Sequence, residues 1–315
     1  MGIVSLAIVK LSLISLLGFF LYKRKGLGEE SLRFLTFFII NFSVPFLIFS
    51  HLIQKSDIVR SFHLGIFISI SFGIFILGYF LGIVFSFLAK KDIRKEFIGS
   101  VSFQNSGYLP MNIAFFLFPQ TLRQEFLVYI FLYLLGFNII MWSVGSYFIF
   151  RKKNERFKAK TIFSPPIVGT LLALLFIYTH TAVFVLEVLL SPLKMIGDSS
   201  FILSALVLGC WLAKIDLKNI SQRLFILGVV GFLKLLVIPF LFFMILVKFN
   251  VFSILGLFVV LEASMPSAVS LPIVANLRRA DSEFVSQSVF FTHILSIITI
   301  PLWIGWYLKM AGLSF

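Results

Sequence analysis

The sequence predicts an all-α membrane protein with ten transmembrane helices. Of its 315 residues, 60% are hydrophobic and only 13% are charged, against about 25% charged in a typical soluble domain. Apolar runs of about 20 residues, the length needed to cross roughly 30 Å of hydrocarbon, recur along the whole chain. The alternating ten-residue strands of a membrane barrel do not occur, so the spans are expected to be helices.

Ten apolar runs, mostly separated by short polar connections, are expected to cross the membrane. They cover residues 3–22, 34–53, 63–89, 97–118, 126–150, 163–185, 195–213, 222–247, 251–276 and 284–308. The connections leave no room for a soluble domain. The single cysteine, Cys210, excludes a disulfide framework and a cysteine metal site.

The distribution of Lys and Arg predicts the orientation of these spans. Nineteen of the 27 basic residues lie in or beside the odd-numbered connections, and six lie in the even-numbered connections and at the C-terminus. Because cytoplasmic loops carry the excess of basic residues, both termini are expected outside the cytoplasm of an inner (plasma) membrane. The net charge of +14 then reflects topology and contacts with the lipid bilayer, and no nucleic-acid partner is expected.

The two halves of the chain are expected to be inverted repeats. Residues 1–150 hold the first five spans and residues 161–315 the second five, with the basic segment 151–160 as a cytoplasmic linker. Because an odd number of spans makes up each half, the second half must run through the membrane in the opposite orientation.

Spans four and nine are interrupted at matching places in their repeats. Span four contains Gln104, Asn105, Gly107 and Pro110, and span nine contains Ser264, Pro266 and Ser267. Both interruptions lie about 15–20 Å into their spans, near the bilayer midplane. Proline breaks or kinks a helix, and unwound backbone is tolerated there only inside protein or beside water. An ordinary proline kink is the alternative, but two matched breaks favour a transporter's binding site, whose half-helix N-termini suit an anion.

Several motifs resemble the auxin efflux carrier family, the prokaryotic relatives of the plant PIN-FORMED carriers. They are Asn41-Phe42-Ser43-Val44-Pro45 in span two, Asn105-Ser106-Gly107-Tyr108-Leu109 in span four, Pro165-Pro166-Ile167-Val168-Gly169 opening span six, Lys234-Leu235 with Pro239 in span eight, and Met265-Pro266-Ser267-Ala268-Val269 in span nine. Their order and spacing cover the whole chain. The early Pro110 and the Ser270 that stands where an Asn often follows are departures, and both touch the expected substrate site.

The resemblance implies a fold and a substrate class. Spans four and nine would cross at their breaks in a mobile transport domain that moves against a scaffold, each domain drawn from both repeats. The substrate would be a small organic anion, such as auxin or a dicarboxylate. We therefore expect the seven interruption residues and Asn41 to contact substrate. Assembly of two copies of the chain into a homodimer is a further expectation.

Glu262 and Lys234 are the two charged residues expected deep in the membrane. Such residues are functional by default, so Glu262 and Lys234 are both expected to take part in ion coupling, with Glu262 carrying a proton or helping to bind Na⁺. No cofactor and no other metal is expected. A structural pair between the two residues is the alternative. His293, in span ten, is expected to pack in the scaffold.

Three functions follow from these observations. The first is a secondary transporter of a small organic anion, which the family resemblance implies is a carboxylate, working by alternating access. The second is a sodium-coupled symporter of the bile-acid type, which the chain resembles more distantly. The third, an intramembrane enzyme or sensor, is disfavoured because no catalytic constellation and no output domain occurs, and no ATP-binding motif supports a primary pump.

Overall fold

The computed structural model describes residues 2–150, 163–215, 220–277 and 280–313, and all regular elements of these residues are helical. The segment 151–160, expected as a linker, lies outside the described residues. Within them, seven helical segments are long and apolar enough to cross a membrane, in agreement with an integral membrane protein.

The seven long segments include four single helices and three that contain a wider turn. They are α1 (Gly2–Lys23), α2–η1–α3 (Glu29–Phe38, Ile39–Ser43, Val44–Gln54), α5 (Leu64–Phe85) with η2 (Ser86–Leu88), α8–η4–α9 (Gln120–Ile139, Ile140–Val144, Gly145–Phe150), α11 (Glu187–Lys214), α12–η7–α13 (Ile220–Phe232, Leu233–Val237, Ile238–Lys248) and α16 (Ser282–Ala311). Expected span seven therefore begins earlier than residue 195, and Pro192 lies inside α11.

The remaining elements are shorter. Three of them are apolar helices: α7 (Tyr108–Leu117), α10 (Pro165–Tyr178) and α14 (Ile254–Ala263). The others are α4 (Ser56–Ser61), η3 (Lys91–Ile93), α6 (Arg94–Ser102), η6 (Ala182–Phe184) and α15 (Leu271–Leu277). Expected spans four and nine thus correspond to the helix pairs α6/α7 and α14/α15.

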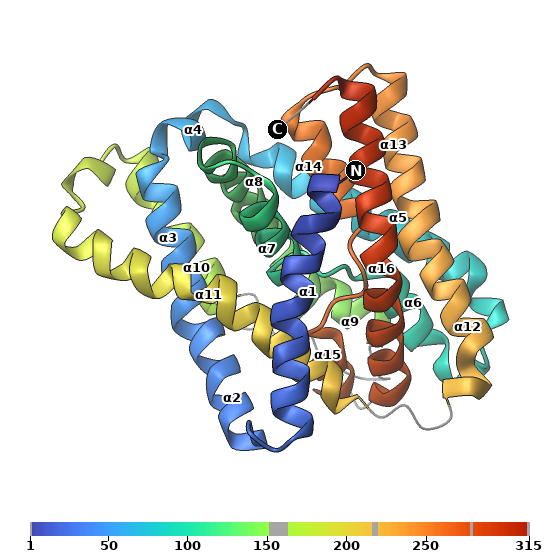
Figure 1. Cartoon of the computed structure of the whole chain (residues 1–315). Coiled ribbons are helices and arrows are strands. Elements are labelled where there is room, and N and C mark those ends of the chain that lie inside the picture. The colour runs from blue at the N-terminus through green and yellow to red at the C-terminus, as the bar shows by residue number, and fades with distance from the viewer. Residues whose placement is uncertain (1, 151–162, 216–219, 278–279, 314–315) are drawn as a thin grey trace.

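The helices surround α8, which is largely buried, whereas α1 lies at the periphery. Large apolar side chains such as Leu13, Phe80 and Phe225 stay exposed on the outside, as lipid contact requires. Figure 1 shows the start of α1 and the end of α16 at one end of the molecule, and the α1–α2 turn at the other. That turn carries the basic residues Lys23, Arg24 and Lys25.

The elements η1, η4 and η7 are single π-helical turns inside three of the long segments. Pro45 and Pro239 lie two residues after η1 and η7. Proline cannot donate to the carbonyl four residues earlier, so Pro239 leaves the carbonyl of Leu235 without its usual partner. The indole nitrogen of Trp303 donates to this carbonyl over 2.8 Å, which ties α16 to the wide turn.

Helices α1 and α11 cross at unusually close range. A Cβ atom on Gly209 would overlap the carbonyl of Ser15, and one on Gly18 would overlap the backbone of Leu206. Ser15 Oγ also donates to the Ala205 carbonyl over 3.1 Å. Small residues let helix backbones approach, and close packing drives helix association in lipid.

Candidate substrate cavity

The interruptions of the two broken spans meet inside the protein. Helix α6 ends before the extended residues 103–106, and α14 ends before residues 264–270. The backbone N–H of Asn105 donates to the Pro266 carbonyl over 2.8 Å, and that of Ala268 donates to the Phe103 carbonyl over 3.0 Å. These antiparallel bonds satisfy backbone groups that lipid could not satisfy.

Side chains complete this backbone pairing. The Ser267 N–H donates to Thr292 Oγ1 of α16 over 3.2 Å, and Ser267 Oγ donates to the carbonyl of Ser100 over 2.7 Å. Ser264 Oγ bonds back to the Leu261 carbonyl at the end of α14 over 2.9 Å. Ser264, Pro266 and Ser267 are buried and join the interruptions to their surroundings; they do not line the cavity described next.

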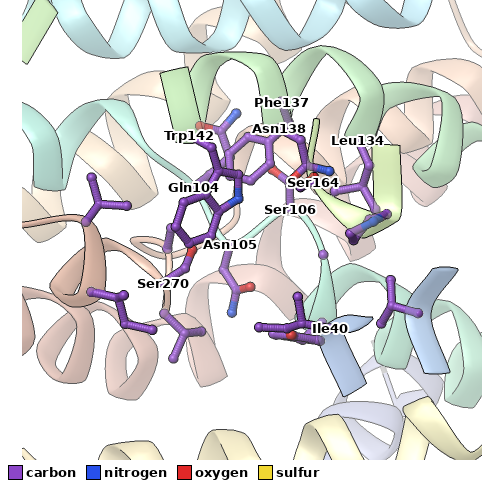
Figure 2. Close-up of a pocket in the computed structure, with 18 of the residues that line it drawn as sticks. Ile40, Gln104, Asn105, Ser106, Leu134, Phe137, Asn138, Trp142, Ser164 and Ser270 are labelled. Atoms are coloured by element: carbon purple, nitrogen blue, oxygen red, sulfur yellow. The ribbon is translucent and has the colours of Figure 1, made fainter. Parts of the chain in front are cut away.

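A cavity of about 630 Å³ lies beside the junction. Its lining comes from both interruptions, from the middle of α2–η1–α3, from α8–η4–α9, and from the ends of α10 and α11. The lining includes the polar residues Thr36, Gln104, Asn105, Ser106, Asn138, Ser146, Ser164 and Ser270, and the aromatic residues Tyr108, Phe137, Trp142 and Trp211. Figure 2 shows amide, hydroxyl and aromatic groups gathered around it.

The predicted site residues divide into two groups. Gln104, Asn105 and Gly107 line the cavity. Pro110 is buried within α7, and Asn41 lies in η1, where its Nδ2 donates to the Phe37 carbonyl over 2.8 Å. Neither of these two is among the cavity residues.

Several lining residues escaped the sequence analysis, which followed the helix interruptions. Asn138 and Trp142 lie in the continuous helical segment α8–η4, and Thr36, Ser164 and Trp211 lie on three further elements. Asn138 could have been found from the sequence, because it is an amide within the very apolar fifth span and buried amides need hydrogen-bond partners. Nothing in the sequence indicated that Trp211 also lines the cavity.

None of the described residues that line the cavity carries a formal charge. Two helix N-termini reach the cavity: the start of α7 contributes Gly107 and Tyr108 to the lining, and the start of α10 contributes Ser164 and Pro166. The first two residues of α10 are prolines, which have no N–H, so the unpaired N–H groups that favour an anion come mainly from α7.

Glu262 lies at the end of α14, fully buried and outside the cavity lining. Neither of its carboxylate oxygens has a hydrogen-bond partner among the described residues, and the same holds for Gln104 Oε1 and Ser106 Oγ. The Ser106 side chain lies close to both the Glu262 carboxyl and the Tyr133 phenol. Gln104 Nε2 donates to that phenol over 2.6 Å. These groups form a buried cluster rich in unpartnered oxygens.

Lys234 is buried in η7, and its Nζ donates to the carbonyl of Val101 over 2.9 Å. This carbonyl lies in the last turn of α6, where a helix lacks internal partners and favours a cation. No ion pair between Lys234 and Glu262 occurs among the described residues. Lys234 is therefore a cap for the broken helix, and the structural pair considered from the sequence is not formed.

A family model described as "Membrane transport protein" matches residues 3–304. The chain belongs to this family. It is the auxin efflux carrier family that the motifs resemble, so that prediction is confirmed. Membership favours transport over the intramembrane enzyme or sensor considered above.

Two relatives of the membrane transport protein family are archaeal. The chain is 26% identical over 299 residues to an uncharacterized transporter of Methanothermobacter thermautotrophicus, covering 91% of this chain and 93% of the relative. It is 24% identical over 295 residues to an uncharacterized transporter of Methanocaldococcus jannaschii, covering 90% and 91%. The similarity therefore extends over the broken spans and the cavity in a single alignment.

Proposed function

We propose that this family member is a secondary carrier that moves a small organic anion, a carboxylate, through the cavity by alternating access. The observation that carries the proposal is the junction of two broken helices beside a cavity of about 630 Å³ to which both contribute polar groups. Broken helices that meet at mid-membrane are the usual substrate sites of secondary transporters.

The proposed architecture is ten spans in two inverted repeats of five. The seven long segments and the pairs α6/α7 and α14/α15 account for nine of them, and the shorter apolar helix α10 for the tenth. The broken helices would cross in a mobile domain. Support comes from their matching places in the two halves and from the side chains of α16 that hold the junction.

The carboxylate would be bound by oriented neutral groups. The Asn138 amide, the hydroxyls of Ser164 and Ser270 and the first turn of α7 line the cavity, and no described lining residue carries a charge. Such binding suits one carboxylate attached to an apolar or aromatic body, because Phe137, Trp142, Trp211 and aliphatic side chains make up much of the remaining lining.

The cavity would be accessible from the cytoplasm. Its outer lining, Ser164 and Trp211, lies near the ends of helices that join the Lys- and Arg-rich connections. By the positive-inside rule these connections face the cytoplasm, with both termini outside. The structure would then correspond to an inward-facing state.

Coupling to H⁺ or Na⁺ is assigned to the cluster around Glu262. Four oxygens of Glu262, Gln104 and Ser106 are buried together, and the Ser106 hydroxyl is the one side-chain donor beside the carboxyl among the described residues, a costly arrangement that a bound proton or a hard cation would relieve. The same oxygens favour the second candidate, a sodium-coupled symporter. A Glu262→Gln variant that transports with unchanged dependence on both ions would contradict this assignment.

A thermal-shift screen of the detergent-purified protein tests the substrate class. The probes are malonate, malate, indole-3-acetate and cholate, each with Na⁺ or K⁺ at two pH values, beside uncharged analogues. A ligand of the folded state raises the unfolding temperature by mass action. We expect a carboxylate shift that Asn138→Leu reduces and Asn41→Leu, the same change outside the cavity, preserves. Stabilisation only by neutral or cationic solutes would contradict the organic-anion assignment.

A further inference from the structure

Two side chains connect the substrate cavity to a second, smaller cavity. Asn105 lines the larger cavity, and His293 of α16 lines an apolar one of about 280 Å³ between α1, α11 and α16. Asn105 Nδ2 lies 3.0 Å from His293 Nε2, and both residues are buried. His293 is therefore buried in α16 and also reaches the first interruption.

Hydrogen bonding fixes which nitrogen of His293 carries the proton. Nδ1 lies 2.8 Å from the carbonyl oxygen of Val289, and a carbonyl can only accept, so Nδ1 donates. In a neutral ring Nε2 then has only a lone pair to offer. Its partner is the amide nitrogen of Asn105, which donates. The neutral imidazole with its proton on Nδ1 satisfies both contacts.

The same contact orients the Asn105 carboxamide. Because His293 engages Nδ2, Oδ1 is the amide atom left for the cavity, and it has no hydrogen-bond partner among the described residues. Oδ1 is an acceptor only. In this state Asn105 presents to the cavity a group that a carboxylate, also an acceptor, cannot bond.

Protonation of His293 would reverse the orientation of Asn105. An imidazolium donates from both nitrogens, so Nε2–H would oppose the donating amide nitrogen. A half-turn of the carboxamide places Oδ1 on Nε2–H and turns the NH₂ group toward the cavity. The proton also adds a positive charge beside a cavity whose described lining has none.

Other titratable groups on the surrounding elements leave the imidazole untouched. The elements packed against α16 carry Lys10 and Lys23 (α1), Arg94, Lys95 and Glu96 (α6), Arg223 (α12), Lys234 (η7) and Glu262 (α14), and α16 itself carries Glu283, Tyr307 and Lys309. Among the described residues, the hydrogen bonds of the imidazole go only to Asn105 and Val289. Asn105 therefore responds to the protonation of His293 directly.

We propose that His293 is a positioning residue of the substrate site whose protonation turns the Asn105 amide from acceptor to donor, so that a carboxylate and a proton bind together. This rests on the proposed carboxylate transport. It adds His293 as a proton site, separate from the Glu262 cluster, and makes the transported unit an anion plus a proton.

The first test needs no ligand. The full chain is labelled with ¹⁵N-histidine in detergent, and the His293 ring signals are identified by their loss in His293→Gln. At pH 8 we expect the neutral tautomer protonated on Nδ1. A ring protonated on Nε2, or one doubly protonated at pH 8, would overturn the proposal whatever the substrate is.

The second test measures proton uptake on binding. Malonate, malate and indole-3-acetate are titrated calorimetrically into the protein near pH 7 in two buffers of different ionisation enthalpy. We expect up to one proton taken up per anion, and binding that weakens by up to about tenfold per pH unit above neutrality. His293→Gln, whose amide still offers an acceptor to Asn105, should bind without proton uptake.

The matched control is His63→Gln, because His63 is exposed at the start of α5. It should keep the proton uptake of the wild type. Uptake that persists in His293→Gln would overturn the proposal. Failure of every carboxylate to bind at any pH would instead overturn the proposed substrate class and with it the joint binding, while the tautomer measurement decides the state of His293 on its own.

Discussion

The Ser267 hydroxyl in the second interruption donates over 2.7 Å to the Ser100 carbonyl in the helix before the first. In a continuous helix this carbonyl would accept from the N–H of residue 104, but α6 ends at Ser102. The second interruption therefore supplies a donor to a carbonyl that the first interruption leaves without its helical partner.

Removing this hydroxyl should destabilise the protein. In Ser267→Ala the Ser100 carbonyl is left buried and without its partner, which costs about 1–3 kcal/mol. The half-buried Ser86, whose hydroxyl makes an exposed bond of 2.8 Å to the Ile83 carbonyl, supplies the control Ser86→Ala. Thermal unfolding in detergent should separate the two variants, and equal unfolding temperatures would contradict the role of Ser267.

Lys234 and Glu262 should behave as energetically independent residues. Lys234 is engaged by the Val101 carbonyl, and the two side chains form no ion pair. The stability changes of Lys234→Met and Glu262→Gln should therefore add within about 0.5 kcal/mol in the double variant. A double-mutant cycle on unfolding free energies measures this, and a coupling above about 1 kcal/mol would restore the pair predicted as the alternative.

Ligand binding should change the fluorescence of the cavity tryptophans. Trp142 and Trp211 line the cavity, whereas Trp303 bonds to the Leu235 carbonyl and neither of these two residues is part of that lining. A carboxylate that stabilises the protein should shift or quench the emission. The change should shrink in Trp142→Phe and Trp211→Phe and persist in Trp303→Phe. A response lost only in Trp303→Phe would place the ligand elsewhere.

The close crossing of α1 and α11 should not tolerate a methyl group. In Gly209→Ala the new Cβ meets the Ser15 carbonyl, so the helices must separate, at a cost of about 1–3 kcal/mol or more. A Cβ atom added to Gly228, on α12, would meet no atom within 4 Å, so Gly228→Ala supplies the control. Comparable unfolding temperatures for the two alanine variants would show that the crossing adjusts freely.

The sequence was sufficient for the features that depend on local composition. Apolar runs identify the spans because hydrocarbon demands them, and Gly107 and Pro266 mark the interruptions because they disrupt helices locally. The beginning of α11 was missed: Glu187, Ser191 and Pro192 resemble a connection in the sequence, yet the structure places them within the helix.

Partnerships between distant residues could not be predicted. From the sequence, His293 was assigned to packing and Asn105 to substrate binding. The two residues are 188 positions apart, and only the fold brings their side chains into contact. The same holds for Asn138, whose place beside the cavity depends on how α8 is rotated against the broken helices. Helix rotation is set by packing of many side chains, and no short motif records it.

The wide turn η7 also affects how this sequence can evolve. A residue added to an ordinary α-helix rotates everything after it by about 100° around the helix axis. A π turn takes up one extra residue within the turn, so the helix after it keeps nearly its original orientation. Deleting one residue from η7 would therefore close it to an ordinary turn and leave the lipid-facing and inward-facing positions along the eleven residues of α13 almost unchanged. A relative of the same length that lacks the wide turn would instead need a new pattern of surface and interior residues there.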